Sequence, residues 1–297
     1  MLAAEQCELP LPVWLRTAAE LKQAAAASGR TAKIALWGGE PLLYSGFDTL
    51  AEQLYHDGFE LEIVTNGTLI DHHSDTLCEC LDTIHVSLDG FGAAHDAVRG
   101  AGVFERVRRN LPLLKRRRGK LVFLCTISDA NVDRMAQLPH QLAELGPDEI
   151  VLQQLMYLTG PEIAAYRDFS RRIFGCDYPE LEAWRRDDDR DYLTMLREGV
   201  LQVAQEHYPV PVRFTPHLYP DHAGTPACSA PEHRVHIRHD GAIGFCTDYF
   251  GFTAGNICDG SLEMIFNSPG AVAFRNAVAE EQLPICRHCP WRLQKFV

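Results

Sequence analysis

The sequence predicts an α/β fold built on a parallel sheet, followed by a small cysteine-rich domain. Between residues 33 and 156, short apolar runs alternate with stretches of helical periodicity. After residue 208 this alternation has ended, and Pro, His, Gly and Cys become frequent. Repeated alternation of apolar strands with helices is typical of a parallel sheet covered by helices, which forms either a barrel or a doubly wound sheet.

The first elements are a helix and a strand. Residues 11–29 predict a helix whose alanine-rich end is closed by Gly29. The apolar run KIALW at residues 33–37 predicts the first strand. FDTLAEQLYHDG at residues 47–58 predicts a helix that ends at Gly58, and LEIVT at residues 61–65 predicts the second strand.

The same alternation continues to residue 156. DTIHVSLD at residues 82–89 predicts the third strand, and residues 104–118 predict a helix in which Pro112 introduces a kink. KLVFLCTI at residues 120–127 predicts the fourth strand. A helix is then expected over residues 131–146, and EIVLQQLM at residues 149–156 predicts the fifth strand.

The pattern changes beyond the fifth strand. Residues 161–207 predict a helical insertion of two helices, the second starting near Pro179 and carrying the charge run RRDDDRD. We therefore expect one domain over residues 1–207 and a second over residues 208–297. Within the second, HRVHIRHDGAIGFC at residues 233–246 predicts a β-hairpin with Asp240-Gly241 as its turn.

Size and composition exclude several classes of protein. A chain of 297 residues with 46% hydrophobic and 23% charged residues is ordinary for a globular protein, and its apolar stretches are too short to cross a bilayer. The net charge of −12 opposes nonspecific binding to nucleic acid or anionic lipid. The first residues lack the basic start and unbroken apolar centre of a signal peptide. We expect a cytoplasmic protein with no nucleic-acid or membrane partner.

The ends of the predicted strands indicate where a ligand binds. They read WGGEP, TNGT, SLDG, TISDAN and QQLMYLTG. In barrels and in doubly wound sheets, ligands bind at the carboxyl ends of the strands. Glycines at these ends let the backbone come close to a ligand. The sequence therefore predicts a ligand site at this edge of the sheet.

Four cysteines near the C-terminus form a second candidate site. Cys228 and Cys246 are separated by seventeen residues that include the predicted hairpin turn, and Cys286 and Cys289 form a CxxC motif. Four converging thiolates bind zinc or an iron–sulfur cluster, and the spacing alone leaves both open. The alternative is four unrelated buried cysteines.

The ordered series of motifs resembles the radical S-adenosylmethionine (SAM) superfamily. It comprises GGEP (38–41), TNG (65–67), SLDG (87–90), HDAVRG (95–100) and Asn131. The tail resembles the SPASM/twitch extension and, with four cysteines, its shorter twitch version. The resemblance implies a partial (β/α)6-type barrel lacking its first strand, followed by a small cysteine-rich domain of a β-hairpin plus helix. It also implies one auxiliary [4Fe-4S] cluster, held by Cys228, Cys246, Cys286 and Cys289.

The resemblance implies that SAM is held at the strand ends. Residues 38–41 would hold its methionyl amino group, while Ser87, Asp89 and Arg99 would face the ribose and the methionyl carboxylate. Asn66 would lie on the same rim, and Leu155 would lie near the adenine. The complete implied set is Gly38, Gly39, Glu40, Pro41, Asn66, Ser87, Asp89, Arg99 and Leu155.

By the same resemblance, the protein is a radical SAM oxidoreductase or a peptide- or small-molecule-modifying enzyme. A 5′-deoxyadenosyl radical would abstract a substrate hydrogen, and an electron donor such as flavodoxin or ferredoxin is expected. Asp248, Tyr157 and Tyr249 are candidate walls of the substrate site, because they follow the fifth strand or the Cys246 arm.

One motif of the family has no counterpart in this sequence. The CxxxCxxC motif that binds the SAM-reducing cluster is expected before GGEP, where Cys7 is the only cysteine. We expect an N-terminal truncation, with the second [4Fe-4S] cluster present only in a full-length form. The alternatives are a degenerate, non-catalytic member acting in binding or electron transfer, and a four-cysteine site that holds structural zinc.

Overall fold

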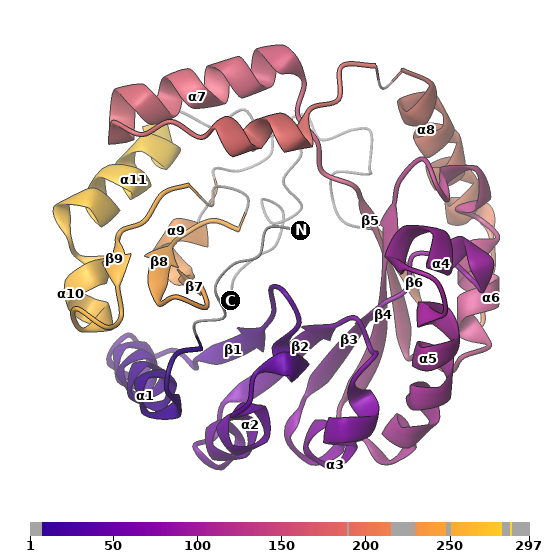
Figure 1. Cartoon of the computed structure of the whole chain (residues 1–297), viewed down its shortest axis with the longest axis horizontal. Helices are drawn as coiled ribbons and strands as arrows, with labels where there is room; N and C mark the ends of the chain where they lie inside the picture. The colour runs from indigo at the N-terminus through magenta and orange to yellow at the C-terminus, as the bar shows by residue number, and fades with distance from the viewer. Residues whose placement is uncertain are drawn as a thin grey trace. The chain divides into compact units, whose positions relative to one another are not determined.

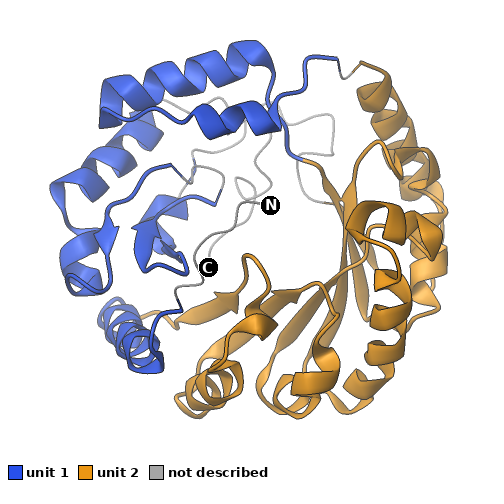
Figure 2. Ribbon diagram, viewed as in Figure 1, with its two compact units in different colours: residues 1–28, 156–189, 221–297 blue, residues 29–155, 190–220 orange. Residues whose placement is uncertain are grey.

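The computed structural model describes residues 8–188, 190–214, 228, 230–247, 251–280 and 286. The chain divides into two compact units (Figure 2). Unit 1 comprises residues 1–28, 156–189 and 221–297, and unit 2 comprises residues 29–155 and 190–220. The sequence-based division into residues 1–207 and 208–297 stays a prediction.

Unit 2 is built on a parallel sheet of six strands that pair in chain order (Figure 1). The strands are β1 (Lys33–Leu36), β2 (Glu60–Thr65), β3 (Thr83–Ser87), β4 (Lys120–Ile127), β5 (Glu149–Gln154) and β6 (Val212–Phe214). All neighbouring pairs are parallel. The predicted α/β class is therefore confirmed. The sequence analysis missed β6, because three residues are too few to show a period.

Helices cover one face of this sheet (Figure 1). The α-helices are α2 (Phe47–His56), α3 (Ile70–Cys80), α4 (Ala93–Arg99), α5 (Val103–Asn110), α6 (Leu138–Ala143) and α8 (Arg190–Gln205). The 3₁₀ segments are η1 (Pro41–Leu43), η2 (Leu111–Arg116) and η3 (Val132–Arg134). The helix predicted over residues 104–118 becomes η2 at Leu111, because Pro112 has no N–H to donate. Pro139 likewise opens α6, separate from η3.

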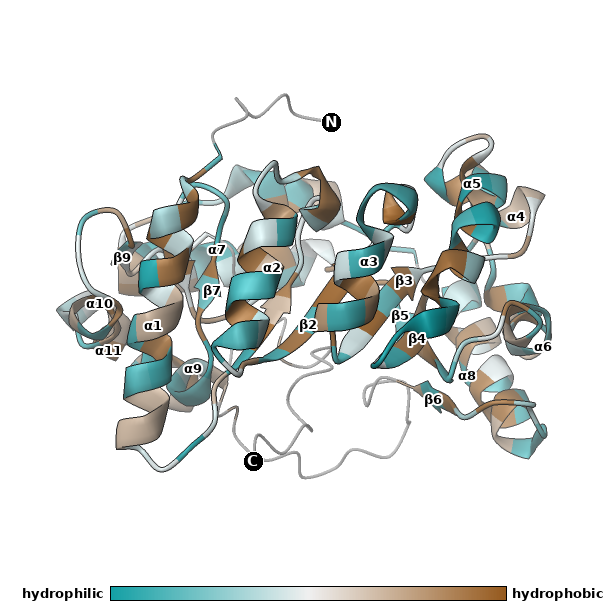
Figure 3. Ribbon diagram, turned by 90° about the horizontal axis from the view of Figure 1, so that it is seen from below, coloured by the Kyte–Doolittle hydropathy of each residue, from teal (hydrophilic) through white to brown (hydrophobic). Residues whose placement is uncertain are grey.

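The core of unit 2 lies between the sheet and these helices. Alternate residues of β2 and β3 are buried, and Leu61, Ile63, Ile84 and Val86 have no exposed surface. The strands are mostly hydrophobic, whereas α2 and α3 carry hydrophilic residues (Figure 3). In β3, the polar residues Thr83, His85 and Ser87 alternate with the buried Ile84 and Val86 and therefore lie on the opposite face.

Unit 1 combines helices with a small antiparallel sheet. Its helical elements are α1 (Leu11–Ala27), α7 (Gly160–Phe174), η4 (Pro179–Trp184), α9 (Ala230–His233), α10 (Leu262–Phe266) and α11 (Pro269–Glu280). Its strands are β7 (His236–Ile237), β8 (Ala242–Gly244) and β9 (Gly255–Asn256). β7 and β8 form the predicted hairpin, with Gly241 in its turn at φ 83°.

The prediction of a long helix from Pro179 was wrong. Only the 3₁₀ segment η4 starts there, and the next helix, α8, begins at Arg190. Arg185, which follows η4, is extended and forms a bridge with Leu158, because Leu158 N donates to Trp184 O and Arg186 N donates to Leu158 O. This pairing with a distant residue overrides the local helical pattern. Within the described residues, no helix has the length and hydropathy needed to cross a membrane.

Candidate functional site

The GGEP segment leaves the end of β1 through two glycines in the left-handed region. Gly38 has φ 92° and Gly39 has φ 51°, values that residues with a Cβ atom rarely adopt. Glu40 then caps η1, because its Oε1 accepts from Leu42 N at 3.2 Å. The predicted close-approach segment thus lies at the carboxyl edge of the sheet, and its shape depends on glycine.

The Glu40 carboxylate joins the ends of two strands. Its Oε1 accepts from Thr65 Oγ1 at 2.7 Å, and its Oε2 accepts from Asn66 N at 2.7 Å. Asn66 shapes the following turn, since its Oδ1 accepts from Thr68 N at 2.8 Å. The Glu40 side chain therefore positions the GGEP segment against the end of β2.

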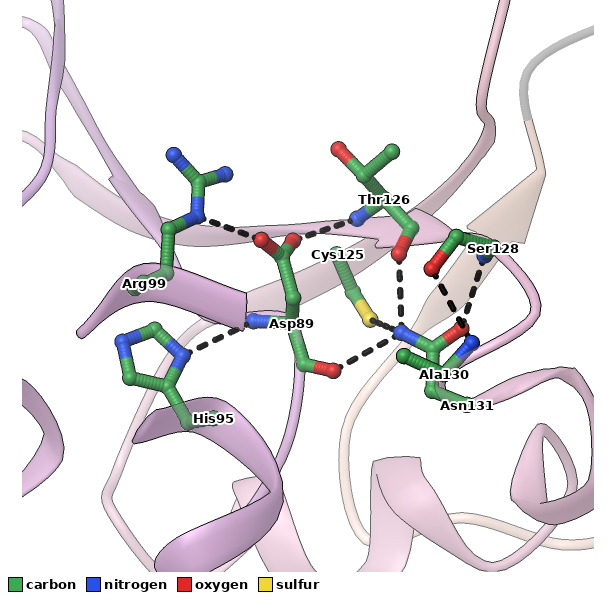
Figure 4. Close-up of polar contacts among 8 residues, drawn as sticks. All are labelled: Asp89, His95, Arg99, Cys125, Thr126, Ser128, Ala130 and Asn131. Carbon is green, nitrogen blue, oxygen red and sulfur yellow. Dashed lines mark hydrogen bonds and ion pairs between the residues drawn. The ribbon is translucent and has the colours of Figure 1, made fainter. Parts of the chain in front are cut away.

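Asp89 lies at the centre of a second network, one strand further along (Figure 4). Its carboxylate is 2% exposed. Oδ2 accepts from Arg99 Nε at 2.5 Å, and Oδ1 accepts from Thr126 N at 2.8 Å. The Asp89 N–H donates to His95 Nδ1 at 3.1 Å. The SLDG and HDAVRG motifs are thus joined to each other and to the end of β4.

Asn131 completes this network from the loop after β4. Its Nδ2 donates to Asp89 O at 2.7 Å and to Thr126 O at 2.8 Å, and its Oδ1 accepts from Ser128 N at 2.8 Å (Figure 4). The side chain is buried. The amide fixes the ends of β3 and β4 relative to each other, a role that the sequence analysis did not assign.

Two further predicted SAM residues lie at the same edge. Ser87 is the last residue of β3, and its hydroxyl makes no hydrogen bond within the part of the chain that the structure describes. Leu155 follows β5, and its N–H donates to Ile127 O at 2.8 Å. Leu155 is 41% exposed. Their contact with SAM stays a prediction.

Burial controls the chemistry of the groups beneath this edge. It lowers the pKa of His95 below its usual value, so the ring stays neutral, as acceptance by Nδ1 requires. It raises the pKa of the Cys125 thiol well above its usual range, which makes that cysteine unreactive. Neither group is suited to proton transfer or nucleophilic attack.

Three of the four predicted metal ligands lie in unit 1 around one apolar core. Cys286 is a buried member of that core, and Cys228 and Cys246 pack against it. Cys289 lies outside the described residues. Among the residues that are described, no group of three or more His, Cys, Asp or Glu side chains is assembled at metal-binding distances. The donor set still fits a sulfur-binding metal or cluster, because three thiols share one water-poor core.

Aromatic rings pack around the cysteine arm. Phe245, next to Cys246, is fully buried, and Phe252 and Phe274 stack with ring centroids 4.6 Å apart. Tyr157, a predicted substrate-site wall, is 6% exposed, and the Arg186 guanidinium lies 5.5 Å from its ring centroid. The other two predicted walls, Asp248 and Tyr249, lie outside the described residues.

Two family models match the chain. The Radical SAM superfamily matches residues 9–138, and the iron–sulfur cluster-binding SPASM domain matches residues 228–290. The second range contains all four predicted ligands. Together the two ranges include every residue assigned to SAM or metal except Leu155.

A sequence relative and two solved structures are similar to this chain. The relative is the pre-heme d1 synthase of Dinoroseobacter shibae, 32% identical over 146 residues, which are 48% of this chain and 36% of the relative. Streptococcus suis SuiB, bound to the precursor peptide SuiA, has a TM-score of 0.61 and 15% identity over 95% of this chain and 64% of that chain. The anSMEcpe structure with AdoMet and the Kp18Cys peptide has a TM-score of 0.55 and 17% identity over 94% of this chain and 78% of that chain.

These likenesses differ in what they establish. At 15–17% identity, the two structures show a shared fold. The chain spans little more than a third of the length of the pre-heme d1 synthase and under two thirds of SuiB.

Proposed function

Because the chain belongs to the radical SAM superfamily and carries a SPASM domain, we propose that it acts as a radical SAM enzyme that binds SAM at the strand ends of unit 2. The observation that supports this most directly is the Asp89–Arg99 network. It holds the Arg99 guanidinium at the carboxyl edge of the sheet through Nε, the one guanidinium nitrogen that makes a hydrogen bond within the described residues. A planar fork of donors is the group that best recognises a carboxylate, and SAM carries one on its methionyl moiety.

The remaining strand ends offer complementary groups for the rest of SAM. The two glycines at positive φ bring backbone close to a ligand amino group. Ser87, the last residue of β3, contributes a hydroxyl for the ribose. Leu155 presents half-exposed apolar surface for the adenine ring. We assign the SAM contacts to Gly38, Gly39, Ser87, Arg99 and Leu155, with Glu40, Pro41, Asn66 and Asp89 shaping the same edge.

For the second site we propose one auxiliary [4Fe-4S] cluster of the twitch type at Cys228, Cys246, Cys286 and Cys289. The chemistry that the bound groups supply is a 5′-deoxyadenosyl radical that abstracts hydrogen from the substrate, with an iron–sulfur centre as electron acceptor or substrate ligand. The protein's part is to orient SAM and to exclude water around the cysteines, where Phe245 is fully buried. Reducing equivalents would come from a flavodoxin- or ferredoxin-like donor in the cytoplasm.

The substrate class is a small molecule or a peptide. The pre-heme d1 synthase supports the first by its name, and the folds of SuiB with SuiA and of anSMEcpe with Kp18Cys support the second. The sequence before Gly38 holds one cysteine, Cys7, so these residues do not supply three thiolates for a SAM-reducing cluster.

Two measurements on this chain test the proposal. Equilibrium dialysis against SAM should show saturable binding, and Arg99→Ala should weaken it. Anaerobic reconstitution with iron and sulfide should load about four irons per chain, and Cys286→Ser with Cys289→Ser should lower the iron bound, whereas Cys176→Ser, an exposed thiol outside the set, should not. Unchanged iron in the double variant removes the cluster assignment. Zinc in place of iron in the purified protein identifies a structural zinc site.

A further inference from the structure

We infer that Asp89 is a positioning residue that orients Arg99 toward the methionyl carboxylate, and that it does not itself contact SAM. The inference rests on the proposed function and deepens it. It differs from the expectation that Asp89 faces the ribose or the carboxylate directly.

The first step of the argument is that both carboxylate oxygens of Asp89 already have protein partners. Oδ2 accepts from Arg99 Nε at 2.5 Å, and Oδ1 accepts from Thr126 N at 2.8 Å. The carboxylate is 2% exposed. A ribose hydroxyl would have to displace one of these bonds, and leaving a buried charge-assisted bond unmade is costly. The carboxylate is therefore part of the framework.

The second step concerns what this contact leaves on Arg99. A guanidinium has five N–H donors, of which the ion pair uses the one on Nε. The two terminal nitrogens point away from Asp89 (Figure 4) and make no hydrogen bond to any described residue. The Arg99 side chain is 35% exposed. The edge that remains carries parallel donors, which is the geometry that a carboxylate accepts in a bidentate manner.

The third step is that the backbone on both sides of the ion pair is also fixed. Asp89 N donates to the neutral ring of His95 at 3.1 Å. Arg99 ends α4, and the loop after it is tied back by Asp96, whose carboxylate accepts from Gly102 N and Phe104 N, each at 2.8 Å. An arginine side chain otherwise loses considerable rotamer freedom when it binds a ligand. Holding it in advance lowers that loss and strengthens binding.

The test compares SAM with decarboxylated SAM, which lacks the carboxylate, by equilibrium dialysis with the full chain. Arg99→Ala should weaken SAM binding about 10- to 100-fold, the range for a hydrogen-bonded ion pair. Asp89→Asn should weaken it about 3- to 10-fold, since the amide presents a donor to either Arg99 Nε or Thr126 N. Both variants should bind decarboxylated SAM within about twofold of the unsubstituted chain. In the double variant, Asp89→Asn should add no further loss, because it acts through Arg99.

Two further variants sharpen the test. Arg99→Lys should lose as much SAM affinity as Arg99→Ala, because one ammonium held by Asp89 cannot also offer two parallel donors. This prediction stands even where Asp89→Asn does not fold. Asp75→Asn makes the same chemical change on α3, where the side chain is 81% exposed and pairs with Arg116 at 3.4 Å. It should leave both affinities unchanged.

Each outcome separates the inference from the proposed function. Equal weakening of SAM and decarboxylated SAM by Asp89→Asn means direct contact with the nucleoside and overturns the inference alone. Tighter SAM binding in that variant means that Asp89 acts only as a repelling charge, which also overturns it. An Arg99→Lys variant that prefers SAM to decarboxylated SAM as strongly as the unsubstituted chain does would also overturn the inference. Failure of the unsubstituted chain to bind SAM overturns the proposed function, and the inference falls with it.

Discussion

Replacing Asn131 with alanine removes three hydrogen bonds to backbone groups at the junction of β3 and β4. The side chain is buried, and its bonds are 2.7 Å to Asp89 O, 2.8 Å to Thr126 O and 2.8 Å from Ser128 N. No other side-chain amide reaches these three backbone groups among the described residues. The substitution therefore leaves two carbonyls and one N–H without these partners.

The expected loss of stability follows from the number of backbone groups that lose a hydrogen-bond partner. Each buried polar group left unsatisfied costs about 1–3 kcal/mol. Water reaches Ser128 more easily than Asp89, because Ser128 is partly exposed. We therefore expect a loss near the lower end, about 3 kcal/mol in total, against an overall stability of about 5–15 kcal/mol for a domain. For a unit of this size, such a loss lowers the Tm by roughly 6–12 °C.

Urea unfolding followed by circular dichroism measures this effect. The control is Gln141→Ala on α6, which removes an exposed amide side chain and should change the free energy of unfolding by less than about 0.5 kcal/mol. An Asn131→Ala variant with the same urea midpoint as Gln141→Ala would refute the reasoning. It would mean that water satisfies the three backbone groups as well as the amide does.

Two other perturbations test different parts of the structure. Gly67→Ala should destabilise unit 2 by about 2 kcal/mol or more, because φ is 77° and a Cβ would lie 3.0 Å from Val86 Cγ1. The control is Gly146→Ala, where φ is 79° but no atom lies within 4 Å of the added Cβ, so only backbone strain destabilises the variant and the loss should be smaller. Equal losses of stability in the two variants would contradict the packing argument. Burial lowers the pKa of His236 from 6.5 to about 4. The unfolded chain therefore binds a proton first as the pH falls, and stability should decline from about pH 6.5 to about pH 4 and then level off. His236→Gln should remove the decline of the urea midpoint between about pH 6.5 and pH 4. A variant with the same pH dependence as the unsubstituted chain would show that other groups cause the decline.

Much of the fold could be predicted because its signals are local. Hydrophobic periodicity gave five of the six strands, and the Asp240-Gly241 pair gave the hairpin turn. The strand β6 and the start of α8 at Arg190 were missed. The first is too short to show a period, and the second depends on backbone pairing between Leu158 and residues 184–186.

The sequence by itself determined which residues lie at the carboxyl edge of the sheet, because a parallel sheet brings all carboxyl ends of its strands together. The sequence also determined which four cysteines are candidate ligands of a metal or cluster, because their spacing can be read directly from it. Only the tertiary structure decided what each polar group at the edge does. Glu40 finds its partners 25 and 26 residues away, and Asp89 finds Thr126 37 residues away. Such bonds depend on strand register. A local sequence pattern therefore does not distinguish a polar residue that hydrogen-bonds to the protein from one that is left to contact a ligand.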